Sequence, residues 1–122
     1  MKILIVEDVP ALSAAIATRL KKRGIDSAIT SRGTEALEML KSSDDFDLVW
    51  LDFNILDFDG LEFMKRYIQT SQKSQIPVII VSNTGDDEKI KQAVELGVKK
   101  YIIKAEARLD DTIDGVLKVI TK

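Results

Sequence analysis

The stretch ILIVED, residues 3–8, places four apolar residues directly before two carboxylates. A short apolar run rich in branched residues is typical of a strand buried on both faces of a parallel sheet. Similar runs recur at residues 48–51, 78–81 and 101–103, and residues 27–29 form a weaker, edge-like candidate. The sequence therefore predicts five strands.

Helical patterns separate these runs. Leu12, Ile16 and Leu20 recur every four residues, as expected for the buried face of a helix. Pro10 suits the start of this helix and Gly24 suits its end. Further helices are expected over residues 34–40, 61–68, 88–96 and 109–120.

Strands that alternate with helices favour parallel βαβ units with right-handed crossovers. We therefore expect a three-layer α/β/α sandwich around a five-stranded parallel sheet. The strand order 2-1-3-4-5, which is the flavodoxin-like order, would place the first and third strands side by side. The 122 residues suit one domain, and we expect it to span residues 1–122. Phe46, Trp50 and Phe63 are expected in its core.

The composition excludes several classes of function. The chain has no histidine and no cysteine, so it has no Ser-His-Asp or Cys-His nucleophile, no thiolate or imidazole metal site and no thiol redox centre. A net charge of −2 gives no overall attraction to nucleic acid or to an anionic membrane. The apolar runs are far shorter than the ~20 residues of a membrane-spanning helix. We expect a cytoplasmic protein.

Polar residues follow the predicted strands. Glu7 and Asp8 follow the first, Asp52 the third, Ser82 the fourth and Lys104 the fifth. In an open parallel sheet, ligands bind at the carboxyl ends of the strands. If strands one and three are neighbours, the three acids converge there.

Converging acids need a cation. Two carboxylates about 5 Å apart repel each other by about 3 kcal/mol at an effective dielectric constant near 20. One lysine cannot neutralise three acids, whereas Mg²⁺ with oxygen ligands can. We expect Asp8 and Asp52 as direct ligands, the backbone carbonyl of Asn54 as another, and Glu7 acting through water or a hydrogen bond.

Asp52 is a candidate nucleophile of the kind that forms an aspartyl phosphate, because it lies at a strand end among apolar residues. Ser82 could donate a hydrogen bond to one phosphoryl oxygen, and Lys104 could pair with another. The alternative is that the acids are solvated strand caps. The joint pattern of acid, hydroxyl and lysine after successive strands favours the functional interpretation.

Over its whole length the chain resembles the receiver domain of two-component response regulators, in particular the single-domain chemotaxis regulators. The matching stretches are ILIVED (3–8), DLVWLD (47–52), DGLE (59–62), PVIIVS (77–82) and residues 97–104. The resemblance implies a phosphoacceptor signalling domain that is not an enzyme in the usual sense.

The resemblance also implies roles for individual residues. Asp52 would be the phosphoacceptor, with phosphate contacts from Ser82 and Lys104. Tyr101 would be the aromatic switch residue that moves together with Ser82. The remaining implied roles are magnesium binding by Glu7, Asp8, Asp52 and Asn54, and an influence on phosphate lifetime by Asn54 and Thr84.

The sequence departs from the family pattern at three positions. Leu56 and Ala105 stand where prolines are usual, and Asn83 replaces a small residue. Because a cis bond before a residue other than proline costs about 3–4 kcal/mol, we predict a trans Lys104-Ala105 bond. Leu56 removes a rigid φ angle from its loop, and the larger Asn83 is expected to narrow access for the phosphodonor.

Three other functions compete with this interpretation. A magnesium phosphatase of the haloacid dehalogenase type needs an acid where Asn54 stands, and an electron carrier that binds flavin mononucleotide needs a loop without acids where Glu7 and Asp8 stand. A receiver that signals by docking without phosphorylation remains the third. The complete set of acids, hydroxyl and lysine disfavours it.

The implied partners are proteins. Because the chain has no histidine, a phosphohistidine donor must belong to a sensor histidine kinase or a histidine phosphotransfer protein. No helix-turn-helix pattern follows residue 120, so we expect a downstream protein target and no nucleic acid. Phosphorylation-dependent homodimer formation is left open, as is the choice between a stand-alone receiver and a part of a longer regulator. A set of basic residues forms either a solvated face or a surface for an acidic partner: Lys89, Lys91, Lys99, Lys100 and Arg108.

Overall fold

The computed structural model describes residues 1–43, 45–70, 76–83, 85–104 and 108–120. Five parallel strands form one sheet of order β2-β1-β3-β4-β5, as predicted. The strands are β1 (Lys2–Val6), β2 (Asp26–Thr30), β3 (Leu48–Asp52), β4 (Val78–Ser82) and β5 (Lys100–Ile103). The helices are α1 (Pro10–Lys22), α2 (Gly33–Ser42), α3 (Gly60–Thr70), α4 (Asp87–Glu95) and α5 (Leu109–Ile120).

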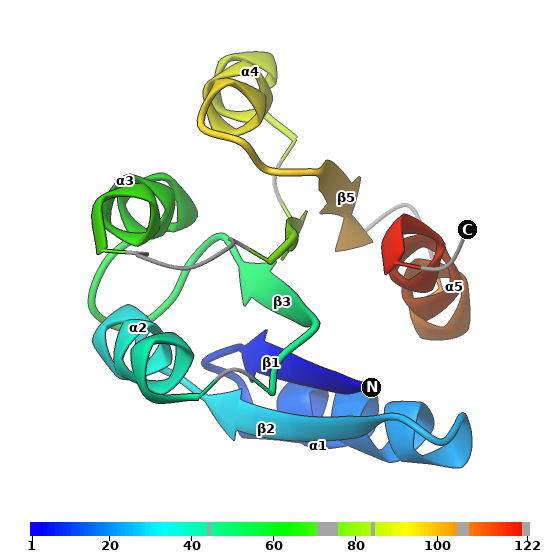
Figure 1. Cartoon of the computed structure of the whole chain (residues 1–122). Coiled ribbons are helices and arrows are strands. Elements are labelled where there is room, and N and C mark those ends of the chain that lie inside the picture. The colour runs from blue at the N-terminus through cyan, green and yellow to red at the C-terminus, as the bar shows by residue number, and fades with distance from the viewer. Residues whose placement is uncertain (44, 71–75, 84, 105–107, 121–122) are drawn as a thin grey trace.

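The helices cover both faces of the sheet. Figure 1 shows α2, α3 and α4 along one face and α1 and α5 along the other. Strand side chains alternate between the two faces, so each of the buried strands supplies both cores. The predicted three-layer α/β/α sandwich is confirmed.

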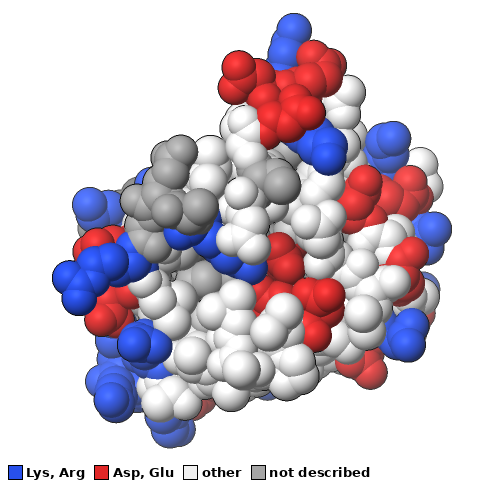
Figure 2. Space-filling model, turned by 180° about the vertical axis from the view of Figure 1, so that it is seen from behind, with Lys and Arg blue, Asp and Glu red and all other residues white. Residues whose placement is uncertain are grey.

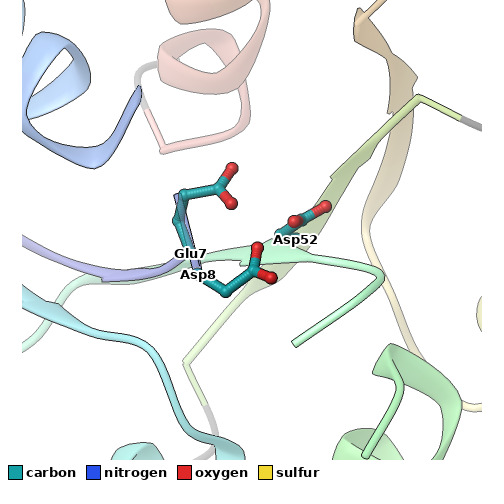
Figure 3. A group of neighbouring side chains, drawn as sticks. All are labelled: Glu7, Asp8 and Asp52. Atoms are coloured by element: carbon teal, nitrogen blue, oxygen red, sulfur yellow. The ribbon is translucent and has the colours of Figure 1, made fainter. Parts of the chain in front are cut away.

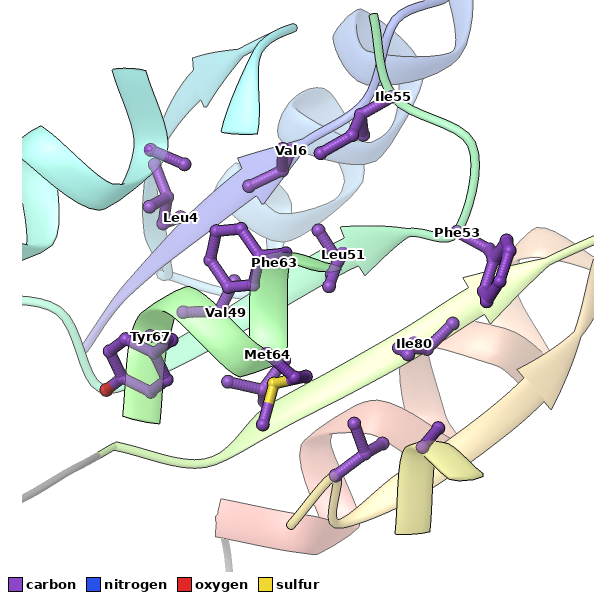
Figure 4. Close-up of a cluster of buried hydrophobic side chains, with 14 of the residues drawn as sticks. Leu4, Val6, Val49, Leu51, Phe53, Ile55, Phe63, Met64, Tyr67 and Ile80 are labelled. Atoms are coloured by element: carbon purple, nitrogen blue, oxygen red, sulfur yellow. The ribbon is translucent and has the colours of Figure 1, made fainter. Parts of the chain in front are cut away.

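The core beneath α2, α3 and α4 is rich in aromatic side chains. Phe63 and Tyr67 of α3 stack with their ring centroids 6.0 Å apart. They pack over Leu4, Val49 and Leu51 from the two central strands. Figure 4 shows these side chains filling the space between the sheet and α3. Dense apolar burial on this face holds β1 and β3 rigidly side by side.

The core beneath α1 and α5 is mainly aliphatic. Ile16 and Leu20 of α1 and Ile113 of α5 are fully buried there, as the four-residue spacing predicts. Trp50 of β3 belongs to the same core and is 1% exposed. Phe46 and Phe63 are buried as well, so all three expected core aromatics lie inside.

Two helix ends follow the predicted pattern. Gly24 after α1 and Gly97 after α4 have φ angles of 76° and 103°. Side chains with a Cβ rarely adopt such angles, and for this reason glycine ends these helices. The Ile25 amide then returns to the Leu20 carbonyl at 3.0 Å, which turns the chain into β2.

The sequence patterns located every element but missed some ends. Asp52 and Ser82 lie within their strands, as the last residues of β3 and β4. The weak candidate at residues 27–29 extends to Asp26–Thr30 and forms an edge of the sheet, as expected. Its side chains are mostly half-buried or exposed, which explains the weak apolar signal.

None of the described helices is long and apolar enough to cross a membrane.

Candidate functional site

Three carboxylates meet at the carboxyl end of the central strands. Glu7 and Asp8 follow β1, and Asp52 ends β3 beside it, because Val6 pairs with Leu51. One carboxylate oxygen from each acid lies within 4.8 Å of the others. Figure 3 shows the three side chains gathered around one space. The convergence predicted for strands one and three is confirmed.

These acids are withdrawn from solvent. Glu7 is 2% exposed and Asp52 is 7% exposed, while Asp8 is half-buried. Burial of a carboxylate is unfavourable unless charge or hydrogen bonds compensate it. The site therefore depends on cations close to the acids.

Lys104, which directly follows β5, supplies one such cation. Its Nζ donates to Glu7 Oε1 at 2.8 Å and lies 3.5 Å from Asp52 Oδ1. The Lys104 side chain is 17% exposed. Because one lysine faces three acids, the cluster retains a formal excess of negative charge.

This excess shifts the pKa values of the acids. Burial, a hydrogen bond with Glu7 and the neighbouring negative charges raise the pKa of Asp52 to about 7, although Lys104 opposes them. Burial also acts to raise the pKa of Glu7, but hydrogen bonds with Lys104 and Asp52 hold it below its usual value. Without a further cation, a proton is therefore retained on Asp52 below about pH 7.

The excess of negative charge also affects the pKa of Asp8. Burial and the adjacent Glu7 raise the pKa of the Asp8 carboxyl above its usual value. A divalent cation between Asp8 and Asp52 would remove the unfavourable interaction and displace the proton. The donors are all oxygen atoms, which hard cations prefer.

Ser82 lies on the neighbouring strand. It ends β4 and is fully buried. Asp52 pairs with Val81 in the sheet register, so Ser82 is one residue further toward the carboxyl edge. Asn83 follows it and is exposed. Thr84 lies outside the described residues.

Asn54 lies in the loop between β3 and α3, two residues beyond Asp52. It forms an antiparallel bridge with Asp59, and the Gly60 amide donates to the Phe53 carbonyl at 2.8 Å. These backbone contacts close residues 54–59 into a short loop that begins two residues after Asp52.

The same loop is tied to α2 by contacts that the sequence patterns did not reveal. The Leu56 amide donates to the Ser31 carbonyl at 3.3 Å, a bond that proline cannot make. Asp57 accepts hydrogen bonds from the backbone amides of Gly33 at 2.7 Å and Thr34 at 3.0 Å, and from the Thr34 hydroxyl. Asp57 therefore caps the N-terminus of α2.

This cap shifts the titration of Asp57. Burial acts to raise its pKa, but the hydrogen bonds from Thr34 and Gly33 outweigh burial and lower it to about 2. These contacts restrain the loop next to Leu56.

An aromatic pair links the site to β5 and α4. Phe53, the residue after Asp52, lies 6.4 Å from Tyr101 between ring centroids. The Lys89 ammonium of α4 lies 5.1 Å from the centroid of the Phe53 ring. Tyr101 is half-buried, on the same sheet face as the aromatic core. The predicted trans bond between Lys104 and Ala105 lies outside the described residues.

Comparisons with known proteins define the class. Residues 3–114 match the family described as the response regulator receiver domain, and the chain belongs to this family. It is therefore a receiver domain of two-component signalling, which is a signalling domain and not a classical enzyme.

Among particular relatives, the chain is 30% identical over 121 residues to the chemotaxis protein CheY-3 of Vibrio cholerae, covering 97% of this chain and 92% of that protein. It is 29% identical over 105 residues to the chemotaxis protein CheY1 of Helicobacter pylori, covering 85% of each.

Solved structures agree with the fold. The BeF3-activated N-terminal receiver domain of RstA from Klebsiella pneumoniae superimposes with a TM-score of 0.82 at 26% identity, covering 98% of this chain and 97% of that one. The non-phosphorylated HemR receiver domain from Leptospira biflexa superimposes with a TM-score of 0.86 at 24% identity, covering 99% of this chain and 94% of that one. The latter likeness concerns the fold alone.

Proposed function

We propose that the chain receives a phosphoryl group on Asp52. The observation that carries this proposal is the buried cluster of Glu7, Asp8, Asp52 and Lys104 at the carboxyl edge of the sheet. Such a cluster is unfavourable without added charge, and a phosphoryl group with a divalent cation supplies matched charge of both signs.

In the proposed reaction, an Asp52 carboxylate oxygen attacks the phosphorus atom of a phosphohistidine on a partner protein. An oxygen–phosphorus bond forms and the phosphorus–nitrogen bond breaks. The electron pair of the broken bond goes to the imidazole nitrogen, which takes a proton from solvent. Asp52 must be ionised to attack, and a divalent cation beside it would favour the ionised carboxylate.

The residues present fit Mg²⁺. Asp8, Asp52 and the Asn54 carbonyl would hold it, with Glu7 contributing through water or a hydrogen bond. When bound, Mg²⁺ would neutralise the negative charge of the acids and of the transferred phosphoryl oxygens.

The other residues would stabilise the product. The Lys104 ammonium would pair with one phosphoryl oxygen after leaving Glu7, and the Ser82 hydroxyl would donate to another. We propose Ser82 and Tyr101 as the switch pair, because Tyr101 adjoins Phe53 beside the phosphoacceptor. Asn54 and Thr84 are proposed to influence phosphate lifetime.

We also propose that residues 1–122 form one receiver domain acting in the cytoplasm. Its partners would be a sensor histidine kinase or a histidine phosphotransfer protein, and a downstream protein target. Homodimer formation on phosphorylation remains the alternative route for output.

For the target surface, we propose α4 without a requirement for an acidic partner. The helix protrudes at the top of the molecule and carries side chains of both signs (Figures 1 and 2). Asp87, Glu88 and Glu95 lie on it together with Lys89 and Lys91. This mixture leaves α4 without net positive charge, so its contact with a target would not require an acidic partner surface.

The test is the intact mass of the protein after incubation with acetyl phosphate and Mg²⁺. We expect one added phosphoryl group on the wild type and none on Asp52→Asn. Asp47→Asn is the matched control, because Asp47 precedes the opposite end of β3 and is exposed, and it should be labelled like the wild type. If the wild type stays unlabelled, the docking-only alternative replaces this proposal.

A further inference from the structure

The connection from β2 into α2, residues 30–34, is bound to the end of β1. The Glu7 amide donates a hydrogen bond to the Thr30 carbonyl at 3.0 Å, which ties the backbone at the acid cluster to this connection. The connection is itself braced, because the buried Thr30 hydroxyl donates to the Glu35 carboxylate and accepts from the Arg32 amide at 3.3 Å. Residues 30–34 are therefore restrained relative to β1.

The same connection holds the loop that carries Asn54. The Leu56 amide donates to the Ser31 carbonyl at 3.3 Å. The Asp57 carboxylate, three residues after Asn54, accepts from the Gly33 amide at 2.7 Å. Residues 30–34 therefore join the two chain segments whose oxygen atoms surround the proposed magnesium position.

The glycine at position 33 leaves room for this junction. A Cβ atom there would lie 2.3 Å from the Phe58 ring and 2.9 Å from Cδ1 of Ile55, and both distances are too short for carbon atoms in contact. The Phe58 ring is also covered by Arg66, whose guanidinium lies 4.2 Å from the ring centroid. A larger residue at position 33 would therefore have to displace side chains of the Asn54 loop.

We propose that residues 30–34 position the Asn54 carbonyl relative to Asp8 and thereby raise the affinity of the acid cluster for Mg²⁺. These residues are positioning residues that supply no ligand, and the inference rests on the proposed magnesium site. Loss of a group that orients a metal ligand typically lowers metal affinity by about 10–100-fold. Because Asp57 acts on Asn54 only through the loop backbone, we expect an effect of about threefold to tenfold.

The first test is the Mg²⁺ dissociation constant of the folded protein, measured by titration calorimetry without a phosphodonor. Asp57→Ala should raise it about threefold to tenfold. Asp57→Asn removes the same charge but keeps an acceptor oxygen, so it should retain more of the affinity. Asp86→Ala is the matched control, because Asp86 is an equally exposed acid that caps α4 instead of α2, and it should bind Mg²⁺ like the wild type.

Gly33→Ala tests the junction without a change of charge. Gly33 has no positive φ angle and alanine is favoured over glycine in helices, so the substitution does not weaken α2 itself. We expect weaker Mg²⁺ binding, partly restored in the double variant Gly33→Ala/Phe58→Ala, which lacks the ring. Gly115→Ala is the control, because a Cβ atom there would lie 3.6 Å from its nearest neighbours, an ordinary contact distance.

Amide hydrogen exchange gives a readout that does not depend on variants. Gly33 and Thr34 begin α2, so their amides have no acceptor within the helix and donate to Asp57 instead. Because coupling between two sites is reciprocal, Mg²⁺ should slow exchange at both amides by about the factor by which Asp57→Ala weakens Mg²⁺ binding. The Glu88 amide, which donates to Asp86 at 2.9 Å, should exchange at an unchanged rate.

The outcomes separate this inference from the proposed function. Absence of Mg²⁺ binding by the wild type would overturn both. If the wild type binds Mg²⁺ and both Asp57→Ala and Gly33→Ala bind it equally well, this inference alone is overturned. Equal losses in Asp57→Ala and Asp57→Asn, with exchange unaffected by Mg²⁺, would also overturn it and indicate a simple charge effect. Gly33→Ala decides the question if Asp57→Ala does not fold.

Discussion

Ion pairs at the carboxyl edge of the sheet and on the α1 surface consist of the same kinds of charged groups, but the former are buried and the latter are exposed to solvent. Arg19 contacts Asp110 of α5 at 3.1 Å with both side chains largely exposed. Lys104 contacts Glu7 at 2.8 Å with the carboxylate fully buried. Exposed pairs contribute about 0–1 kcal/mol because water already solvates both ions. Loss of one partner of the buried pair is costly because water does not reach the Glu7 carboxylate to replace it.

The two regions also differ in how positive and negative charges are matched. Arg19 has one acid to neutralise, whereas Lys104 lies beside an acid cluster that exceeds its charge. A surface pair can be lost with little effect. The buried cluster stores unfavourable electrostatic energy that added ligands can release, and this is what distinguishes a binding site from a surface contact.

Removal of the lysine should give the largest effect on stability. Lys104→Met leaves Glu7 buried without its cation, and loss of one partner of a buried pair typically costs about 3–5 kcal/mol. Since Lys104 is 17% exposed, we expect the lower end of this range. Urea unfolding without divalent cations measures it.

Arg19→Met is the matched control for that measurement, with an expected change below about 1 kcal/mol. Equal losses for the two variants would show that burial does not separate the two kinds of ion pair.

Magnesium should stabilise the protein through the acid cluster. At a concentration one hundred times its dissociation constant, a ligand that binds only the folded state adds about 2.7 kcal/mol. Thermal unfolding with and without Mg²⁺ should therefore show a clear upward shift for the wild type. Asp8→Asn should lose most of that shift, and Asp110→Asn on the surface should keep it. A shift retained in Asp8→Asn would place the cation elsewhere.

The Asp57 cap should contribute less and should depend on pH. Asp57→Ala removes the cap of α2, which typically costs about 1 kcal/mol. The folded pKa of about 2 lies below the usual 3.8, so the ionised cap stabilises the fold above about pH 4. This stabilisation is lost as the pH falls through 2.

The measurement is the difference in unfolding free energy between wild type and Asp57→Ala from pH 5 to pH 2. We expect it to shrink steadily toward low pH. Asp57→Asn keeps an acceptor oxygen but does not titrate, so it should be less destabilised than Asp57→Ala at pH 5. A difference that stays constant with pH would contradict the lowered pKa.

The smallest expected effect concerns the position where the family has proline. Leu56→Pro removes the hydrogen bond to the Ser31 carbonyl, worth about 0.5–1.5 kcal/mol, but it also restricts the unfolded chain by about 0.4–1 kcal/mol. The two effects nearly cancel, so we expect urea unfolding to show a net change between a loss of about 1 kcal/mol and a gain of about 0.5 kcal/mol. A net gain of about 1 kcal/mol, the upper value for restricting the unfolded chain, would mean that the Leu56 amide hydrogen bond contributes nothing to the loop.

Much of the fold could be predicted from local patterns. The buried strands read as continuous apolar runs because both of their faces are covered, and the four-residue spacing identified the buried face of α1. The edge strand β2 was the weakest prediction, since Ile29 is 44% exposed and the strand therefore has little apolar character.

The acid cluster could be predicted because strand ends in a parallel sheet share one edge. The pairing of Lys104 with Glu7 could not, because both charges follow strands without any signal of which acid the lysine contacts. The Asp57 cap could not be predicted either, because Asp57 lies 24 positions after Gly33 and 23 positions after Thr34 in the sequence. No local pattern extends over such a separation. The buried indole N–H of Trp50, for which no described residue supplies an acceptor, could not be predicted either, because its surroundings depend on tertiary packing.

The strand order also has a consequence for the order of assembly during synthesis. All three acids lie within the first 52 residues, on strands that pair directly, while the compensating Lys104 follows the last strand. Since chains emerge from the ribosome N-terminus first, β1 and β3 are both synthesised before Lys104. The acid cluster therefore receives the positive charge of Lys104 only when β5 joins the sheet, so addition of the last strand is also the step that partly offsets the repulsion among the acids.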